Sequence, residues 1–249
     1  MTPIEPRDGA LAFAKVSDVH PDRPDGWEGK LFLTFDIDWA HDEVILDVLG
    51  RVEAAGVSAT WFVTHDTPVL ARIRENPLFE LGIHPNFLPL LNGNGENGAN
   101  AEEIVDRLLA IVPEAKAVRS HSLVQSGRLL ELFKRKGLTH ECNVFIPGHS
   151  GIILRPWIDW FGMIRMPYFW EDDFHCEADV SIPIMELLDR PGLHGFDFHP
   201  IHAFLNTDSM ARYEGARDCF HAPERLILHR NSEGAGVADL LAQLLGTAQ

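Results

Sequence analysis

The amino-acid sequence predicts a single α/β domain in which parallel strands alternate with helices. Short apolar runs recur along the chain, and the segments between them repeat apolar residues at helical spacing. The chain has 249 residues, of which 45% are hydrophobic, and this is enough to bury one sizeable core. Alternating strands and helices build a parallel sheet, which is either closed into a β/α barrel or open and doubly wound.

The regular part of the chain is expected to begin at residue 30. Residues 1–29 mix Pro, Asp and Gly without periodicity and are predicted to be an irregular N-terminal segment. Residues 31–35, LFLTF, form an apolar run typical of a strand buried on both faces. Apolar residues at helical spacing follow in 44–52, and Gly56 stands where a glycine commonly ends a helix. Residues 30–249 are therefore predicted to form one domain.

The same alternation continues toward the C-terminus. Further strands are predicted at residues 59–63, 79–83, 117–118, 143–146, 160–166 and 194–199, and further helices at 68–75, 104–112, 129–133 and 237–245. Residues 91–98 are rich in Asn and Gly and are predicted to be a loop. Trp157 and Trp160 lie in a segment that looks like core, so we assign them no functional role.

Composition excludes several classes of function. The formal net charge of −16 disfavours binding to nucleic acid or to anionic membrane surfaces. No stretch approaches the ~18 consecutive apolar residues of a membrane span, and the N-terminal residues lack the apolar core of a signal peptide. A soluble cytoplasmic protein is therefore expected. The widely spaced Cys142, Cys176 and Cys219 are expected to be reduced thiols.

Reactive side chains stand where the predicted strands end, the edge that holds the active site in β/α barrels. They are Asp36 and Asp38 after 31–35, His84 after 79–83, Arg119 and His121 after 117–118, and Asp197 and His199 at the end of 194–199. Three of these places have an i, i+2 spacing, which puts both members of a pair on one face of a strand. Each pair can therefore point into one pocket.

The two aspartates are the most informative pair. Asp42 can cap the following helix, which leaves Asp36 and Asp38 without a structural task. Side chains two apart on a strand lie about 6.6–7 Å apart, so one carboxylate can bind a metal ion while the other addresses a water molecule. Arg119 is suited to hold a carboxylate, because its guanidinium is planar and stays charged.

The histidines and the acidic loop allow alternatives. His84, taken alone, reads more readily as a loop histidine hydrogen-bonded to backbone than as a functional residue. His199 and His202 resemble a metal pair, but Pro200 disfavours the helix that would align them, and we rank His199 as the functional one. A further segment, Trp170-Glu171-Asp172-Asp173, places an aromatic residue beside acids, which suits sugar binding but also a solvated loop.

In this order, the residues resemble the motifs of the polysaccharide deacetylase family, also called NodB-like or carbohydrate esterase family 4. The resemblance covers about residues 31–205. Residues 34–38, TFDID, resemble the first motif and imply that Asp36 is the general base and Asp38 a metal ligand, although Ile37 here separates two acids that are usually adjacent. Residues 81–84, LGIH, resemble the second motif and imply that His84 is a ligand.

The second motif departs from the family at its end. A further histidine normally follows four positions later, where this sequence has Leu88. We propose His121 as the third metal ligand because it lies beside Arg119, with Asn86 or His202 as alternatives.

The remaining motifs imply the other roles. Arg119 matches the arginine that orients the base, and Phe198-His199 resembles the last motif, whose histidine is the general acid. The fourth motif is matched by Trp170 with Asp172 or Asp173, which we assign to substrate binding. The runs HPNF, PYFWEDD and FHPIH resemble the WbmS-like branch, which is associated with bacterial surface-polysaccharide gene clusters.

The resemblance implies a distorted (β/α)7-type barrel and a metal-dependent removal of an N-acetyl group from a sugar. The expected cofactor is a divalent metal ion, with Zn²⁺ favoured by the mixed nitrogen and oxygen ligands. The substrate is expected to be an N-acetylated sugar, an oligosaccharide or a nucleotide sugar. Two alternatives are another metal-dependent amidohydrolase that acts on a non-peptide C–N bond and a catalytically silent relative that binds glycans.

Overall fold

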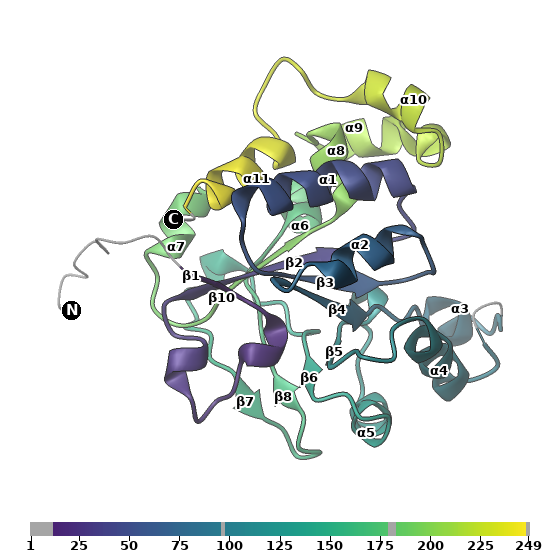
Figure 1. Cartoon of the computed structure of the whole chain (residues 1–249), viewed down its shortest axis with the longest axis vertical. Coiled ribbons are helices and arrows are strands. Elements are labelled where there is room, and N and C mark those ends of the chain that lie inside the picture. Colours follow the sequence, from purple (N-terminus) through teal and green to yellow (C-terminus); the bar gives the residue numbers. More distant parts are fainter. Residues whose placement is uncertain (1–11, 96–97, 179–182, 248–249) are drawn as a thin grey trace.

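A mostly parallel sheet lies at the centre of the protein and helices pack along its outside (Figure 1). The structure is a computed structural model and describes residues 12–95, 98–178 and 183–247. The strands are β1 (Ala12–Ala14), β2 (Lys30–Asp36), β3 (Ala59–Val63), β4 (Phe79–Ile83), β5 (Ala117–Val118), β6 (His140–Glu141), β7 (Trp157–Ile158), β8 (Ile164–Arg165), β9 (Trp170–Glu171) and β10 (His194–Phe198).

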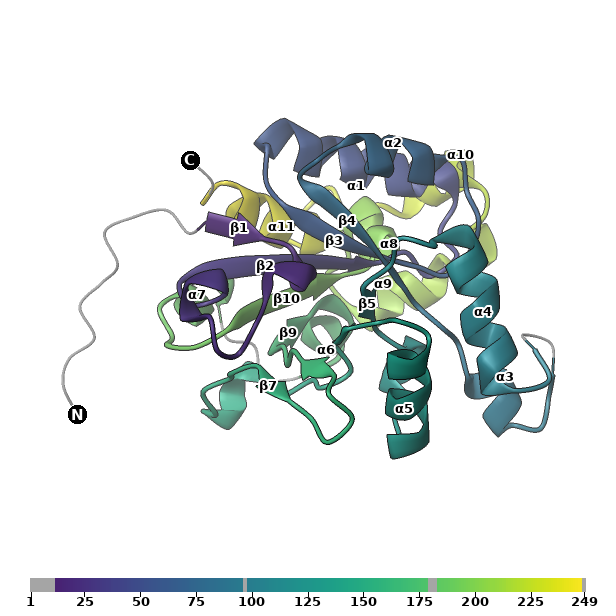
Figure 2. The ribbon, with the colours of Figure 1, turned by 60° about the horizontal axis from the view of Figure 1, so that its bottom comes forward.

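Helices follow most of these strands. They are α1 (Asp42–Ala55), α2 (Val69–Glu75), α3 (Leu88–Leu91), α4 (Ala101–Ile111), α5 (Gly127–Arg135), α6 (Asp172–Glu177), α7 (Ile184–Leu188), α8 (Pro200–Leu205), α9 (Met210–Gly215), α10 (Pro223–Leu226) and α11 (Val237–Leu245). In Figure 2, α1 and α2 lie above the strands, α4 lies to their right and α5 below them. Within the described residues, no helix is both long and apolar enough to cross a membrane.

The sheet curls into a distorted barrel. Its order is β7-β8-β6-β5-β4-β3-β2-β10-β9, and every pairing is parallel except that of β7 with β8. The strands β8 and β9 are the two ends of one continuous piece of chain. This piece pairs with β6 at its start and with β10 at its end, so it joins the two ends of the curled sheet. If residues 164–171 are counted as one strand, they and β2, β3, β4, β5, β6 and β10 make up the seven strands of the expected (β/α)7-type barrel.

The first strand and helix form for the reasons that the sequence indicates. Residues Leu31 to Phe35 of β2 are at most 1% exposed, because β10 and β3 flank the strand and helices cover it. Burial of each large apolar side chain contributes about 1.5–3 kcal/mol. The cap differs from the expected one: His41, and not Asp42, caps α1 by accepting a hydrogen bond from the Glu43 N–H. Gly56 ends the helix with a φ of 65°, as expected.

Two predicted strands are wrong. In place of a strand at 143–146, the structure has β6 at His140–Glu141, and only Phe145 pairs further along, in an isolated bridge with Tyr168. In place of one strand at 160–166, the chain reverses between β7 and β8. The reversal is held by Asp159, whose Oδ1 accepts hydrogen bonds from the backbone of Phe161 and Met163.

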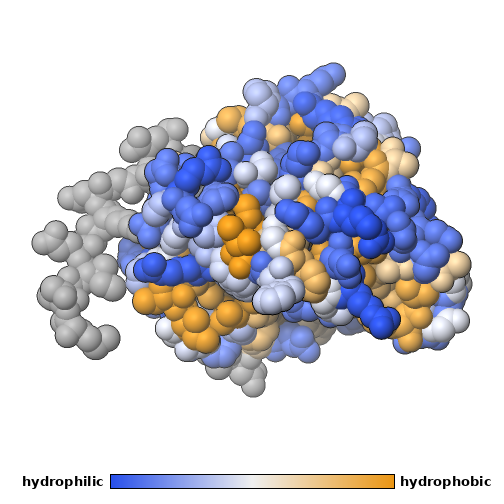
Figure 3. Space-filling view, turned by 90° about the horizontal axis from the view of Figure 1, so that it is seen from below, coloured by the Kyte–Doolittle hydropathy of each residue, from blue (hydrophilic) through white to orange (hydrophobic). Residues whose placement is uncertain are grey.

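This hairpin also corrects the prediction that Trp157 and Trp160 belong to the core. Trp160 lies at the turn and is 95% exposed, and Trp157 on the edge strand is 39% exposed. Figure 3 looks from below, the side on which β7 and β8 lie in Figure 1, and shows apolar side chains exposed on that face. In the segment expected to be irregular, β1 pairs in parallel with β2, so part of it extends the sheet. The three cysteines are free, as expected.

Candidate active site

The carboxyl ends of the central strands open into a cavity of about 410 Å³. The strands β2, β4, β5 and β10 end at or just before the reactive residues that the sequence indicates. Residues that line the cavity include Asp38, Trp39, His121, Asp173, His199 and His202. The strand ends of the barrel therefore gather polar side chains from distant parts of the chain around one hollow.

The side chains of Asp36 and Asp38 both approach the imidazole of His84. A turn in the backbone brings them there, and not the alternation of side chains along a strand. Asp36 is the last residue of β2, whereas Asp38 and Trp39 have φ angles of 34° and 55°. Such a backbone is sparsely populated by residues other than glycine and costs on the order of 1–3 kcal/mol. The Trp39 N–H donates to Thr64 Oγ1 at 3.1 Å and helps to hold the turn. As a result, the two carboxylates approach opposite nitrogens of the His84 ring, Asp36 Oδ2 lying 3.5 Å from Nδ1 and Asp38 Oδ1 3.2 Å from Nε2.

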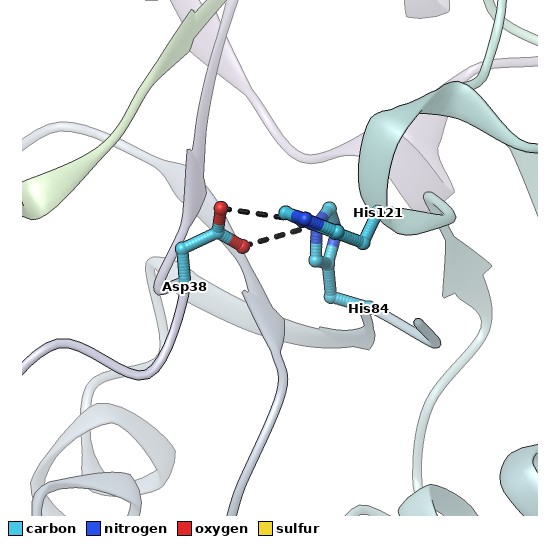
Figure 4. A group of neighbouring side chains, drawn as sticks. All are labelled: Asp38, His84 and His121. Atoms are coloured by element: carbon cyan, nitrogen blue, oxygen red, sulfur yellow. Dashed lines mark ion pairs between the residues drawn. The ribbon is translucent and has the colours of Figure 1, made fainter. Parts of the chain in front are cut away.

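Asp38, His84 and His121 form a cluster that fits a divalent metal ion (Figure 4). One ligand atom from each residue lies within 4.8 Å of the others, and His121 Nδ1 is 3.3 Å from Asp38 Oδ2. Asp38 Oδ1 is buried and makes no hydrogen bond of good geometry, although it faces His84 Nε2 at 3.2 Å. Buried polar atoms are normally paired, so a cation between this oxygen and the two imidazoles fits the site.

Backbone contacts fix both histidines. The His84 N–H donates to the Val63 carbonyl at 2.8 Å, and the His121 N–H donates to the Pro85 carbonyl at 3.0 Å.

Burial raises the pKa of Asp38, but His121 and His84 outweigh burial and hold that pKa well below its usual value. Burial lowers the pKa of His121, but Asp38 more than compensates and raises it.

The alternative third ligands are occupied elsewhere. Asn86 Oδ1 accepts a hydrogen bond from the Leu88 N–H at 2.9 Å and so caps the next turn of chain. Both ring nitrogens of His202 are engaged, one by Thr207 and one by Asp173. The structure therefore brings His121, and not His202, to Asp38 and His84, while Asn86 Oδ1 is engaged by backbone.

Arg119 joins two carboxylates beneath this cluster. Its side chain is 1% exposed, and its Nη1 lies 3.0 Å from Asp36 Oδ1 and also contacts Asp197. The guanidinium lies between the rings of Phe62 and Tyr168, with its central carbon 4.6 and 4.5 Å from the ring centres. Burial lowers the pKa of Arg119, but the two carboxylates raise it well above its usual value. The arrangement fixes Asp36 with one oxygen on Arg119 and the other toward His84.

His199 is held by Asp172. His199 Nδ1 lies 2.7 Å from Asp172 Oδ1, and the His199 backbone N–H donates to Asp172 Oδ2 at 2.7 Å. This leaves Nε2 facing the cluster, 3.7 Å from Asp38 Oδ2. Burial lowers the pKa of His199, but Asp173 and Asp172 outweigh it and raise the pKa well above its usual value. His199 is thus suited to carry a proton on the nitrogen that faces the cavity.

Three of the predicted residues lie in unexpected surroundings. Asp197, two residues before His199 at the end of β10, accepts hydrogen bonds from Arg119 and Thr34. Asp172 is fully buried against His199, and Trp170, at 5% exposed, packs against Phe198 with ring centres 4.7 Å apart. Of the acidic segment, Asp173 is the residue that lines the cavity.

The aromatic wall of the cavity comes from residues that the sequence did not single out. They are Trp39, Tyr213 and Phe220. Trp39 directly follows Asp38, and its position beside a candidate metal ligand could have indicated that it lines the site. Tyr213 in α9 and Phe220 follow no strand, so nothing local marked them. Their ring centres lie 4.8 Å apart, and Tyr213 also packs on His202.

A family model described as WbmS-like polysaccharide deacetylase matches residues 33–217. The chain is similar to the crystal structure of WbmS from Bordetella bronchiseptica, which is assigned as a polysaccharide deacetylase involved in O-antigen biosynthesis. The TM-score is 0.88 and the identity 46%, over 95% of this chain and 98% of that one.

A second crystal structure, of a protein from Mycobacterium smegmatis assigned as a polysaccharide deacetylase, has a TM-score of 0.52 at 14% identity and covers 97% of this chain and 92% of that one. At that identity, the likeness concerns the fold alone. A comparison with curated proteins found no match.

Proposed function

This chain belongs to the WbmS-like family of polysaccharide deacetylases, and we propose that it is a metal-dependent hydrolase that removes an N-acetyl group from a sugar. The observation that carries the proposal is the arrangement of three functions around one cavity. A cluster with metal-ligand chemistry lies between a carboxylate held by Arg119 and a histidine held by Asp172. Hydrolysis of an amide requires a base, an acid and stabilisation of the oxyanion, and these groups supply them.

Asp38, His84 and His121 would hold the metal ion. A set of one carboxylate and two imidazoles suits Zn²⁺ and leaves positions open for water and substrate. When bound, a divalent ion would polarise the acetyl carbonyl and lower the pKa of a water molecule.

The other residues would move the protons. Asp36 would accept a proton from the attacking water, and Arg119 would keep the carboxylate in the position to do so. His199 would deliver a proton from Nε2 to the departing nitrogen, because Asp172 occupies Nδ1 and favours the protonated ring. The products would be acetate and an amino sugar.

The substrate would be an N-acetylated sugar of surface-polysaccharide biosynthesis, as an oligosaccharide or a nucleotide sugar. The WbmS protein of Bordetella bronchiseptica is assigned to O-antigen biosynthesis, and this supports the proposal. The aromatic side chains of Trp39, Tyr213 and Phe220 offer apolar faces against which a sugar ring can pack.

Two substitutions test the division of labour. Asp36→Asn is expected to keep the bound metal and to lose about 10²- to 10⁴-fold in kcat, the usual contribution of a general base. His84→Ala is expected to lose the metal itself. Metal content is measured by elemental analysis of the purified proteins, and turnover by acetate release from N-acetylated sugars.

A matched control is Asp47→Asn. Asp47 is a surface acid of α1 that pairs with Arg51, so its loss is expected to leave both metal content and rate unchanged. Equal metal content and equal rates in Asp36→Asn and His84→Ala would contradict the assignment.

A further inference from the structure

His202 fixes one carboxylate that lines the cavity. Its Nε2 lies 2.6 Å from Asp173 Oδ1, and its Nδ1 lies 3.0 Å from Thr207 Oγ1. The His202 side chain is 1% exposed, and the ring of Tyr213 packs against it with ring centres 4.5 Å apart. The Thr207 N–H in turn donates to the His202 carbonyl at 3.0 Å. These contacts leave the imidazole one orientation, and Asp173 is held with it.

The second oxygen of Asp173 faces the nitrogen of His199 that points into the cavity. Asp173 Oδ2 lies 4.0 Å from His199 Nε2, too far for a hydrogen bond between them. A single substrate atom placed between them can nevertheless lie within about 3 Å of both Asp173 Oδ2 and His199 Nε2. The side chain of Asp173 is 45% exposed, so this oxygen is accessible from the cavity.

The other carboxylates near His199 already have partners within the protein or belong to the candidate metal cluster. Both oxygens of Asp172 accept from His199, and Asp36 contacts Arg119 and His84. Asp38 belongs to the candidate metal cluster. Asp173 already helps to keep His199 protonated through its charge, and its Oδ2 offers a further acceptor beside that acid.

We propose that Asp173 is a further catalytic residue, which accepts a hydrogen bond from the amide N–H of the substrate, and that His202 is its positioning residue. The inference rests on the proposed function and extends it to substrate choice. The site would favour an N-acetyl group over an O-acetyl ester on the same sugar.

The chemistry gives the reason. In deacetylation, water adds its oxygen to the acetyl carbon and the C–N bond breaks. The nitrogen keeps its own hydrogen and takes a proton from His199, so it leaves as an amine. The hydrogen bond from nitrogen to Asp173 persists throughout and strengthens as the nitrogen gains positive charge. An ester oxygen has no hydrogen to donate, and the fixed carboxylate of Asp173 repels its lone pairs.

The test compares amide and ester substrates. Acetate release is measured from a panel of N-acetylated hexosamine nucleotides and oligomers and from their O-acetylated counterparts. The readout is the ratio of kcat/KM for amide to kcat/KM for ester, because loss of metal or of folded protein lowers both together. Asp173→Ala is expected to lower this ratio by about 10- to 100-fold, as for a hydrogen bond to a charged group.

Variants at His202 test the positioning role. His202→Leu keeps most of the volume but removes the donor to Asp173, so the ratio is expected to fall as in Asp173→Ala. His202→Gln restores a donor and is expected to recover part of the ratio. The control Asp208→Ala, on the surface beside Arg212, is expected to leave the ratio unchanged.

The outcomes separate this inference from the proposed function. If the wild-type protein releases acetate and Asp173→Ala has the same ratio of kcat/KM values as the wild type, the inference is overturned and the proposed deacetylation still stands. A wild-type protein that releases acetate from neither class of substrate contradicts the proposed function itself.

Discussion

Replacing Arg119 with methionine removes the single positive charge between two buried carboxylates. Arg119 contacts Asp36 and Asp197, and both carboxylate side chains are at most 5% exposed. Methionine retains much of the volume between Phe62 and Tyr168. The main effect is therefore electrostatic, and no large cavity is expected.

The size of the loss follows from the burial. Removing one partner of a buried ion pair destabilises a protein by about 3–5 kcal/mol, because a charge is left in a poorly solvating interior. For a chain of this size, 1 kcal/mol corresponds to about 2–4 °C in Tm, so a decrease of about 6–20 °C is expected. Arg119→Met should also lose activity, since Asp36 loses the group that orients it.

The loss of stability in Arg119→Met should depend on pH. Burial raises the pKa of Asp197 and Arg119 opposes this, so removal of Arg119 favours the protonated form of the buried carboxylates further. The folded variant then binds more protons than the unfolded chain. Stability of the variant then increases as the pH falls, and the difference from wild type should be smaller at pH 5 than at pH 8.

Thermal unfolding followed by circular dichroism, with a chelator present throughout, measures both effects. The control is Arg212→Met, whose pair with Asp208 at 2.8 Å is exposed and worth less than about 1 kcal/mol. A Tm change in Arg119→Met no larger than in Arg212→Met, or a change that is the same at both pH values, would refute the reasoning.

Two further predictions concern the histidines. His121→Ala should lower metal content as strongly as His84→Ala, and retention of the metal would leave the third ligand to be sought elsewhere. Asp172→Asn should move the alkaline limb of kcat/KM to lower pH, because Asp172 helps to raise the pKa of His199 and so keeps the acid protonated above its usual range. A profile of the same shape and position in Asp172→Asn would contradict the role of that carboxylate.

Much of the barrel could be predicted because its signals are local. The strand β2 and the helix α1 follow from an apolar run and from helical spacing in consecutive residues. The short strands β6, β7 and β8 could not be predicted in this way. They have only two residues each, and pairing with a neighbour defines them more than their own composition does. Trp160 looked like core because its apolar neighbours outweighed the local turn signal of Asp159 and Gly162, of which Gly162 has a φ of 76°.

The chemistry at the strand ends can be predicted from local patterns of residues. Parallel strands bring their carboxyl ends to one edge, so reactive residues that follow apolar runs must meet there, wherever they lie in the chain. Asp36, His84, Arg119 and His199 all follow such runs.

The partner of each of these residues depends instead on how the chain packs. The pairing of His199 with Asp172, the position of Arg119 between two carboxylates, and the clamp of His202 on Asp173 join segments that are distant in sequence. Side-chain directions at these places depend on packing and on turns such as the one at Asp38, where a positive φ overrides strand alternation. Partners are therefore set by long-range geometry, which no local pattern of residues encodes.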